Sequence, residues 1–240
     1  RPAGSRRGRL LLVAATATWT AYNDWGGSNH YQGWCGPNGD RFSPVLSLLR
    51  PLAKGFVSLP ADAPRAVLFE DPPIKSEPRY PHMEWAYANG YSKKYMSSGW
   101  ASFERHFVTW AEAEGYQLDI ISQTDLHYRP ELIEGYPCVA LVGHDEYWSW
   151  EMRDAIDRHV EQGGRIARFA GNFMWQIRLG DQGRTQTCYK YIARAEDPFM
   201  QTGPRNRVTE SWEAPEIGRP GSASFGLNAT HGLYASWSGC

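Results

Sequence analysis

The segment Val139-Ala-Leu-Val-Gly-His-Asp-Glu-Tyr-Trp-Ser-Trp150 changes from apolar to charged at its midpoint. Its first four residues have the composition of a buried strand, and three ionisable side chains, His144, Asp145 and Glu146, follow directly after a glycine. Burying charged groups without partners is costly, so such a row is not expected inside a core. The segment therefore predicts a strand that ends at the rim of a site.

The segments around this strand alternate between strand-like and helix-like patterns. Short apolar runs at residues 9–15, 117–122 and 166–170 are typical of strands, and 66–70 is a weaker candidate. One helix is predicted from Ser102 to Gly115, and a short one at 130–135. Another begins after Ser149, a residue type that caps helices, and stops at Gly163-Gly164. This alternation predicts an open, mostly parallel α/β sheet with helices on both faces.

The chain has 240 residues and a formal net charge of -1, which suits a single α/β domain spanning residues 1–240. We expect a core at about 9–180, a long insertion at about 71–98 and an irregular part after Gln176. The stretch 16–39 is rich in Gly, Asn, Trp and Tyr and is expected to be loop. Because the sequence does not begin with Met, we expect a fragment or one part of a larger assembly.

Composition narrows the possible partners. The near-neutral charge gives no reason to expect nucleic acid, and no segment is long enough to span a membrane. Four cysteines without a CxxC pattern are typical of reduced thiols, which favours a cytoplasmic location. An Arg-Arg pair near the start resembles an export signal, but the apolar run is short and fits a first strand better. Eleven Trp and thirteen Tyr predict either an aromatic pocket or interface, or a Trp-rich core.

Polar side chains follow three of the predicted strands. The first strand leads to Tyr22 and Tyr31, the strand at 139–142 leads to His144 and Glu146, and the last leads to Asn172. In an open α/β sheet, chemistry collects at the carboxyl ends of the strands, so these side chains should meet. Tyr87, Tyr91 and Tyr95 are alternatives for the second tyrosine.

No familiar catalytic motif is present: the sequence has no Gly-x-Ser-x-Gly elbow, Walker loop, GxGxxG or HExxH, and the turn after Val142 has no cysteine nucleophile. Two phenolates and a carboxylate would instead offer hard oxygen ligands and three negative charges, which suits ferric iron. A tyrosine ordinarily holds its proton to about pH 10, but a bound trivalent ion would remove it. The alternative for Glu146 is a carboxylate that merely stabilises a helix start.

The motif Gly143-His-Asp-Glu-Tyr-Trp-Ser-Trp-Glu-Met152, with Gly163-Gly-Arg165 and Gly171-Asn172, resembles the C-terminal catalytic domain of the large subunit of N,N-dimethylformamidase and its relatives. The likeness is strongest over residues 102–172. It implies a fold like class I glutamine amidotransferases and an amidohydrolase with one Fe³⁺ held by two tyrosines and a glutamate. Carried over by position, the metal ligands are Tyr22, Tyr31 and Glu146, with His144 and Asn172 beside the metal.

The resemblance implies hydrolysis of small N-substituted formamides or related amides by a metal-activated water. His144 would pass a proton to the leaving amine, and Asn172 would donate to the oxyanion. It also implies a small subunit and homo-oligomerisation, although the insertion at 71–98 has no counterpart. The residues expected to wall a small dry pocket are Trp19, Trp25, Trp34, Trp148 and Trp175.

Two other functions fit the residues. One is a non-catalytic amidotransferase-like module that recognises a sugar or a partner protein through its aromatic surface. The other is a metal-independent hydrolase that uses Asp145 and Glu146. Adjacent residues in a strand point to opposite faces, which disfavours joint action of these two carboxylates.

Overall fold

A computed structural model of the chain describes residues 9–31, 41–64 and 81–226. Its central element is a four-stranded parallel sheet in the order β5-β1-β6-β8. The predicted strands are confirmed as β1 (Arg9–Ala14), β5 (Gln117–Ser122), β6 (Cys138–His144) and β8 (Arg165–Gly171). The candidate strand at 66–70 lies outside the described residues.

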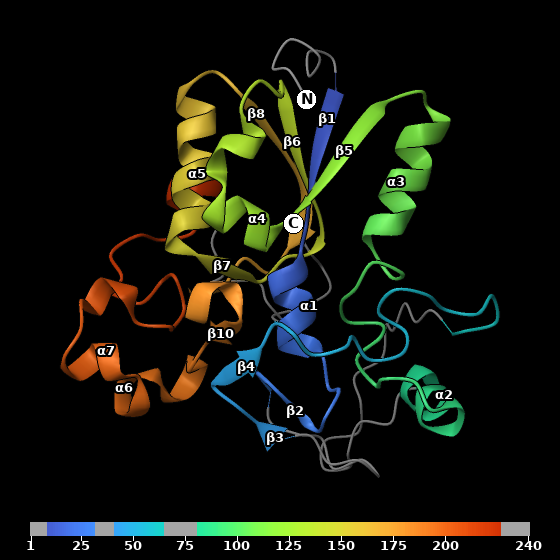
Figure 1. The fold of residues 1–240 in the computed structure, drawn as a ribbon, viewed down its shortest axis with the longest axis horizontal. Coiled ribbons are helices and arrows are strands. Elements are labelled where there is room, and N and C mark those ends of the chain that lie inside the picture. Colours follow the sequence, from blue (N-terminus) through green and yellow to red (C-terminus); the bar gives the residue numbers. More distant parts are fainter. Residues whose placement is uncertain (1–8, 32–40, 65–80, 227–240) are drawn as a thin grey trace, which may run out of the picture.

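Helices cover both faces of this sheet, as predicted. Helix α3 (Glu104–Ala113) packs Phe107 and Val108 against Leu12, Ala140 and Val142 on one face. Helices α4 (Gln123–Tyr128) and α5 (Trp150–Glu161) lie on the opposite face, where their side chains join Leu11, Val13 and Leu141 in the main core. Figure 1 shows α3 on one side of the strands and α4 and α5 on the other.

The predicted helix starts follow from local capping. The Ser149 hydroxyl accepts a hydrogen bond of 3.2 Å from the Met152 amide, which confirms Ser149 as the N-cap of α5. Helix α4 was not predicted, although Ser122 and Asp125 form a reciprocal capping box at its start. The short helix predicted at 130–135 is a 3₁₀ turn, η2 (Pro130–Ile133).

The prediction of loop at 16–39 is wrong at its start, where the chain forms α1 (Thr16–Tyr22). The amide groups at the beginning of this helix find acceptors on distant segments: Glu104 Oε1 accepts from Ala15 at 3.2 Å, and Gln123 Oε1 accepts from Ala17 at 2.9 Å. Tertiary contacts therefore stabilise a helix that has no cap of its own.

A second, smaller sheet has the order β4-β10-β9-β7. Strand β7 (Tyr147–Ser149) begins one residue after Glu146 and pairs in parallel with β9 (Trp175–Gly180). The part expected to be irregular thus contributes β9 and β10 (Thr185–Thr187) to this sheet.

Within the described residues no helix is both long and apolar enough to cross a membrane. The remaining short elements are β2 (Ser28–Asn29), β3 (Arg41–Phe42), β4 (Val45–Ser47), α2 (Pro81–Asn89), η3 (Asp181–Gly183), η4 (Lys190–Ile192), α6 (Ala193–Glu196), α7 (Pro198–Gln201), η5 (Arg205–Arg207) and α8 (Ser222–Phe225).

Candidate functional site

The carboxyl ends of β1, β6 and β8 are neighbours in the sheet, so the segments that follow them meet. Tyr22 is the last residue of α1, the helix that follows β1. Tyr31 lies just after β2, and Glu146 lies just after β6. The three residues expected to act together therefore lie in or just after three separate elements, α1, β2 and β6, beyond the carboxyl ends of the parallel strands (Figure 1).

The two tyrosines converge on one carboxylate oxygen. The Tyr31 hydroxyl donates to Glu146 Oε2 at 2.5 Å, and the Tyr22 hydroxyl donates to the same oxygen at 3.1 Å. Their ring centroids are 4.4 Å apart. Burial raises the pKa of Tyr31 well above its ordinary value of 10, and the nearby Tyr147 and Glu146 add to this effect. In this state Tyr31 is a protonated phenol.

Glu146 is fixed from several directions, and its side chain is buried. Its other oxygen, Oε1, accepts a 2.7 Å hydrogen bond from the Trp175 indole. Its backbone amide donates to Thr18 Oγ1 at 2.9 Å. Burial by itself would raise the pKa of Glu146, but the hydrogen bond and charge attraction of His144, and then Lys190, outweigh it and lower that pKa. The group is therefore a carboxylate at neutral pH.

His144 and Asn172 complete the cluster. The His144 ring places Nδ1 against the Ser97 carbonyl and Nε2 3.4 Å from both the Tyr22 hydroxyl and Glu146 Oε2. Asn172 directs its amide nitrogen at His144 Nε2 across 3.3 Å. Burial alone would lower the pKa of His144, but the interactions with Glu146 reverse this and raise it. Asn172 has a φ of 60°, a left-handed conformation that asparagine tolerates at turns.

Gly143 allows this turn to form. Its φ is 101°, and a Cβ atom at this position would lie 2.8 Å from Phe103 Cβ. No residue with a side chain fits there without displacing Phe103, which packs near the His144 ring at 6.3 Å. The glycine after the apolar run thus determines where His144 and Glu146 point.

Asp145 points away from the cluster formed by its two neighbours. Its carboxylate accepts from Arg168 Nη1 at 2.8 Å, from the Trp148 indole at 2.8 Å and from Gln123 Nε2 at 2.9 Å. Arg168 also reaches the Asp145 carbonyl at 3.2 Å, which ties the turn after β6 to β8. As expected from strand geometry, Asp145 and Glu146 do not share one reacting bond.

Two buried lysines next to the tyrosines were not predicted. The Lys190 ammonium lies 3.5 Å from the centre of the Tyr31 ring and 4.9 Å from that of Trp175. Lys94 lies 5.1 Å from the Tyr31 ring. Burial lowers the pKa of Lys190 to about 8, against the attraction of Glu146. The only sequence signal was two tyrosines flanking Lys190, which is too common to indicate a site.

The insertion predicted at 71–98 reaches this cluster where it is described. Lys94 and the Ser97 carbonyl, both near its end, contact Tyr31 and His144 respectively. The alternative tyrosine Tyr95 is directed elsewhere, because its hydroxyl donates to the Pro64 carbonyl at 2.7 Å.

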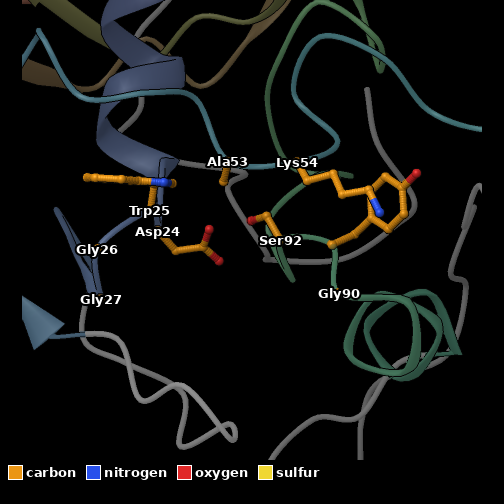
Figure 2. Close-up of a pocket in the computed structure, with 9 residues that line it drawn as sticks. Asp24, Trp25, Gly26, Gly27, Ala53, Lys54, Gly90 and Ser92 are labelled. Atoms are coloured by element: carbon orange, nitrogen blue, oxygen red, sulfur yellow. The ribbon is translucent and has the colours of Figure 1, made fainter.

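The expected aromatic wall is only partly present. Trp175 contacts Glu146, whereas Trp148 binds Asp145 in the core and Trp19 donates to Glu104 at 3.0 Å. Trp25 instead borders a separate cavity of about 560 Å³, and Trp34 lies outside the described residues. Figure 2 shows this cavity, with Asp24 and Trp25 on one side and Lys54 on the other; Tyr91 also lines it.

A cation at this cluster would depend on the tyrosines. In the part of the chain that the structure describes, no group of three or more His, Cys, Asp or Glu residues is placed to hold a metal ion. The convergent hydroxyls of Tyr22 and Tyr31 and the Glu146 carboxylate are the hard oxygen donors available here.

Comparisons with known proteins identify the family of the chain. The chain is 26% identical over 128 residues to an N,N-dimethylformamidase beta subunit from Alcaligenes sp and 25% identical over 128 residues to one from Paracoccus aminophilus. Each match covers 53% of this chain but only 15% of the relative. Residues 1–238 match the family described as N,N-dimethylformamidase beta subunit-like, C-terminal. The chain therefore belongs to the N,N-dimethylformamidase beta subunit-like, C-terminal family.

Proposed function

We propose that this protein is an iron-dependent hydrolase of small N-substituted formamides or related amides, and that Tyr22, Tyr31 and Glu146 hold a single ferric ion. The observation that supports this most is the convergence of both phenolic hydroxyls on one oxygen of Glu146, at 3.1 and 2.5 Å. Names of the relatives support the same reaction class. The parallel sheet with helices on both faces is also compatible with an amidotransferase-like fold.

The chemistry of the three donors fits a trivalent cation. Oxygen ligands of this kind prefer hard ions, and loss of both phenolic protons would give three negative charges around the ion. In the present structure the two phenols keep their protons and direct them at one carboxylate oxygen, and a cation held by the same three residues would displace these protons. Binding is then coupled to proton release.

When bound, the ferric ion would act as a Lewis acid that polarises the amide carbonyl and acidifies a water molecule. Side chains of this protein would stabilise the oxyanion and transfer the proton. Asn172 presents an amide N–H toward the centre of the cluster and could donate to the developing oxyanion, a contribution of about 3 kcal/mol for one such donor. His144 places Nε2 among the same groups and could carry a proton to the leaving amine.

The metal proposal is tested by elemental analysis and visible spectroscopy of the purified chain. We expect one iron per chain and a tyrosinate-to-iron band, both lost in Tyr22→Phe and Tyr31→Phe. Tyr136→Phe is a matched control, because that buried tyrosine also donates to a carboxylate, Asp119, at 2.8 Å but does so away from the cluster. Wild-type protein without stoichiometric iron or the band would refute the ferric assignment.

The catalytic proposal is tested by release of dimethylamine from N,N-dimethylformamide. We expect Glu146→Gln to abolish it. Because the relatives are named beta subunits, we also propose that a small subunit completes the enzyme, so the assay should be run with and without one. An iron-loaded protein that remains inactive on formamides in both cases would favour a different substrate. A metal-free protein whose function survives Glu146→Ala would favour the binding-module alternative.

A further inference from the structure

The ammonium group of Lys190 is buried without a hydrogen-bond acceptor. The side chain is 1% exposed, and its Nζ atom has no acceptor among the described residues. Its surroundings are aromatic, with ring centroids of Tyr31, Trp175 and Tyr147 at 3.5, 4.9 and 5.6 Å. Ring faces attract a cation, but they do not replace the oxygen acceptors that its three N–H donors have in water. Leaving a charged donor unsatisfied is costly, so this arrangement calls for a function.

The carboxylate that attracts Lys190 does not provide that acceptor. Glu146 attracts Lys190 through space, but its two oxygens already accept from Tyr22, Tyr31 and Trp175. The backbone of Lys190 is also strained, because its φ of 53° is a left-handed conformation that a lysine adopts only at a cost in free energy. The ammonium group therefore lies beside Tyr31 despite this strain.

A second ammonium group lies near the same ring. Lys94 is 5.1 Å from the centre of the Tyr31 ring, so the tyrosine is flanked by two ammonium groups. Asp145, the other buried carboxylate of the turn, is already paired with Arg168 at 2.8 Å. A small anion would accept from Lys190 and offset its buried charge. The next residue, Tyr191, is 80% exposed, which places Lys190 close to the protein surface along the chain.

We propose that Lys190 forms an anion subsite of this cluster and that the subsite takes a small monocarboxylate of the size of formate. The size rests on the proposed function, because hydrolysis of a formamide releases formate and an amine. A carboxylate held there would keep the acid product in the site after the amine leaves. Small carboxylates are therefore expected to be inhibitors that compete with the amide.

The first test uses the iron-free wild-type protein, so that an anion cannot bind to the metal instead. Isothermal titration with sodium formate is compared with sodium chloride at equal ionic strength and with formamide, a neutral molecule of the same shape. We expect saturable binding of formate and at least tenfold weaker binding of the other two. No saturable heat from formate up to about 100 mM, or equal binding of formamide, would overturn the proposal.

The second test replaces the cation. Lys190→Met should weaken formate binding by about tenfold to a hundredfold, the effect of losing a charged hydrogen bond. Lys54→Met is the matched control, because Lys54 also lies over a tyrosine ring, that of Tyr91, at 4.1 Å but borders the separate cavity. Circular dichroism checks that both variants fold. If Lys190→Met does not fold, the titration of the wild-type protein with formate decides whether the subsite exists. Unchanged formate binding in folded Lys190→Met would refute the role of Lys190.

The two proposals fail in different ways. If iron-loaded protein hydrolyses no amide but formate still binds through Lys190, the subsite stands and the proposed function falls. If formamides are hydrolysed while formate binding does not depend on Lys190, the function stands and the subsite falls.

Discussion

Glu104 is the residue whose replacement gives the most quantitative prediction. Its carboxylate is 1% exposed, and Oε1 accepts from the Ala15 amide at 3.2 Å and the Trp19 indole at 3.0 Å. These bonds hold the first turn of α1, the helix that ends at Tyr22. The second oxygen, Oε2, has no partner among the described residues. Burial raises the pKa of Glu104 from 4.5 to about 7, and the Asp145 carboxylate adds to this.

The sign of the pH effect follows from proton counting. Between pH 4.5 and about 7 the folded protein keeps the Glu104 proton, while the unfolded chain has lost it. The folded state binds more protons in this window, so the free energy of unfolding falls as the pH rises through it. The difference between the two pKa values corresponds to about 3 kcal/mol, fully lost above pH 7.

The glutamine variant of this residue tests that reasoning. In Glu104→Gln the side-chain carbonyl can still accept from Ala15 and Trp19, and the group never ionises. We expect the variant and wild type to have similar stability at pH 5, and the variant to gain up to about 3 kcal/mol over wild type at pH 8. Urea denaturation followed by tryptophan fluorescence measures both. A stability difference that does not change with pH would refute the assignment of a raised pKa to Glu104.

Three further variants test other contacts of the cluster. Asn172→Gly relieves a left-handed backbone but removes the amide beside His144, so we expect unchanged or slightly higher stability and about a hundredfold lower kcat/KM on formamides. Arg168→Met leaves the Asp145 carboxylate buried and unpaired, which should cost about 3–5 kcal/mol by urea denaturation; adding Asp145→Asn should recover part of it. Ser149→Ala should cost about 1 kcal/mol in the same assay without changing the iron content.

The parallel sheet could be predicted because its strands are short apolar runs separated by helical patterns. The run at 139–142 followed by Gly143 located the end of β6, and the order of the neighbouring strands then brought Tyr22, Glu146 and Asn172 to one edge. Chain connectivity alone limits which strand ends can meet in such a sheet. Pattern and topology thus predict that these three side chains lie at one edge of the sheet.

The features that were not predicted depend mainly on contacts between segments that are distant in the sequence. Helix α1 is stabilised by Glu104, which is 89 residues away from Ala15, so nothing in its own sequence distinguishes it from loop. Strand β9 pairs with β7, and its residues Trp175–Gly180 do alternate between apolar and polar side chains, a strand period that the expectation of an irregular part did not use. Lys190 lies three residues after the end of β10, so its place beside Tyr31 depends on how the second sheet forms. Patterns within a segment do not reveal partners outside it.

The order of His144, Asp145 and Glu146 now has a physical explanation. Alternation along the extended chain sends the first and third side chains to the tyrosines and the second to the interior. Asp145 is stable there only because Arg168, Trp148 and Gln123 satisfy its oxygens, and those partners in turn fix the backbone that carries its neighbours. A charged residue in the core therefore serves the site without touching it. The residue between two functional side chains is as constrained as they are, because a one-residue shift would turn Glu146 away from the phenols and direct Asp145 at them.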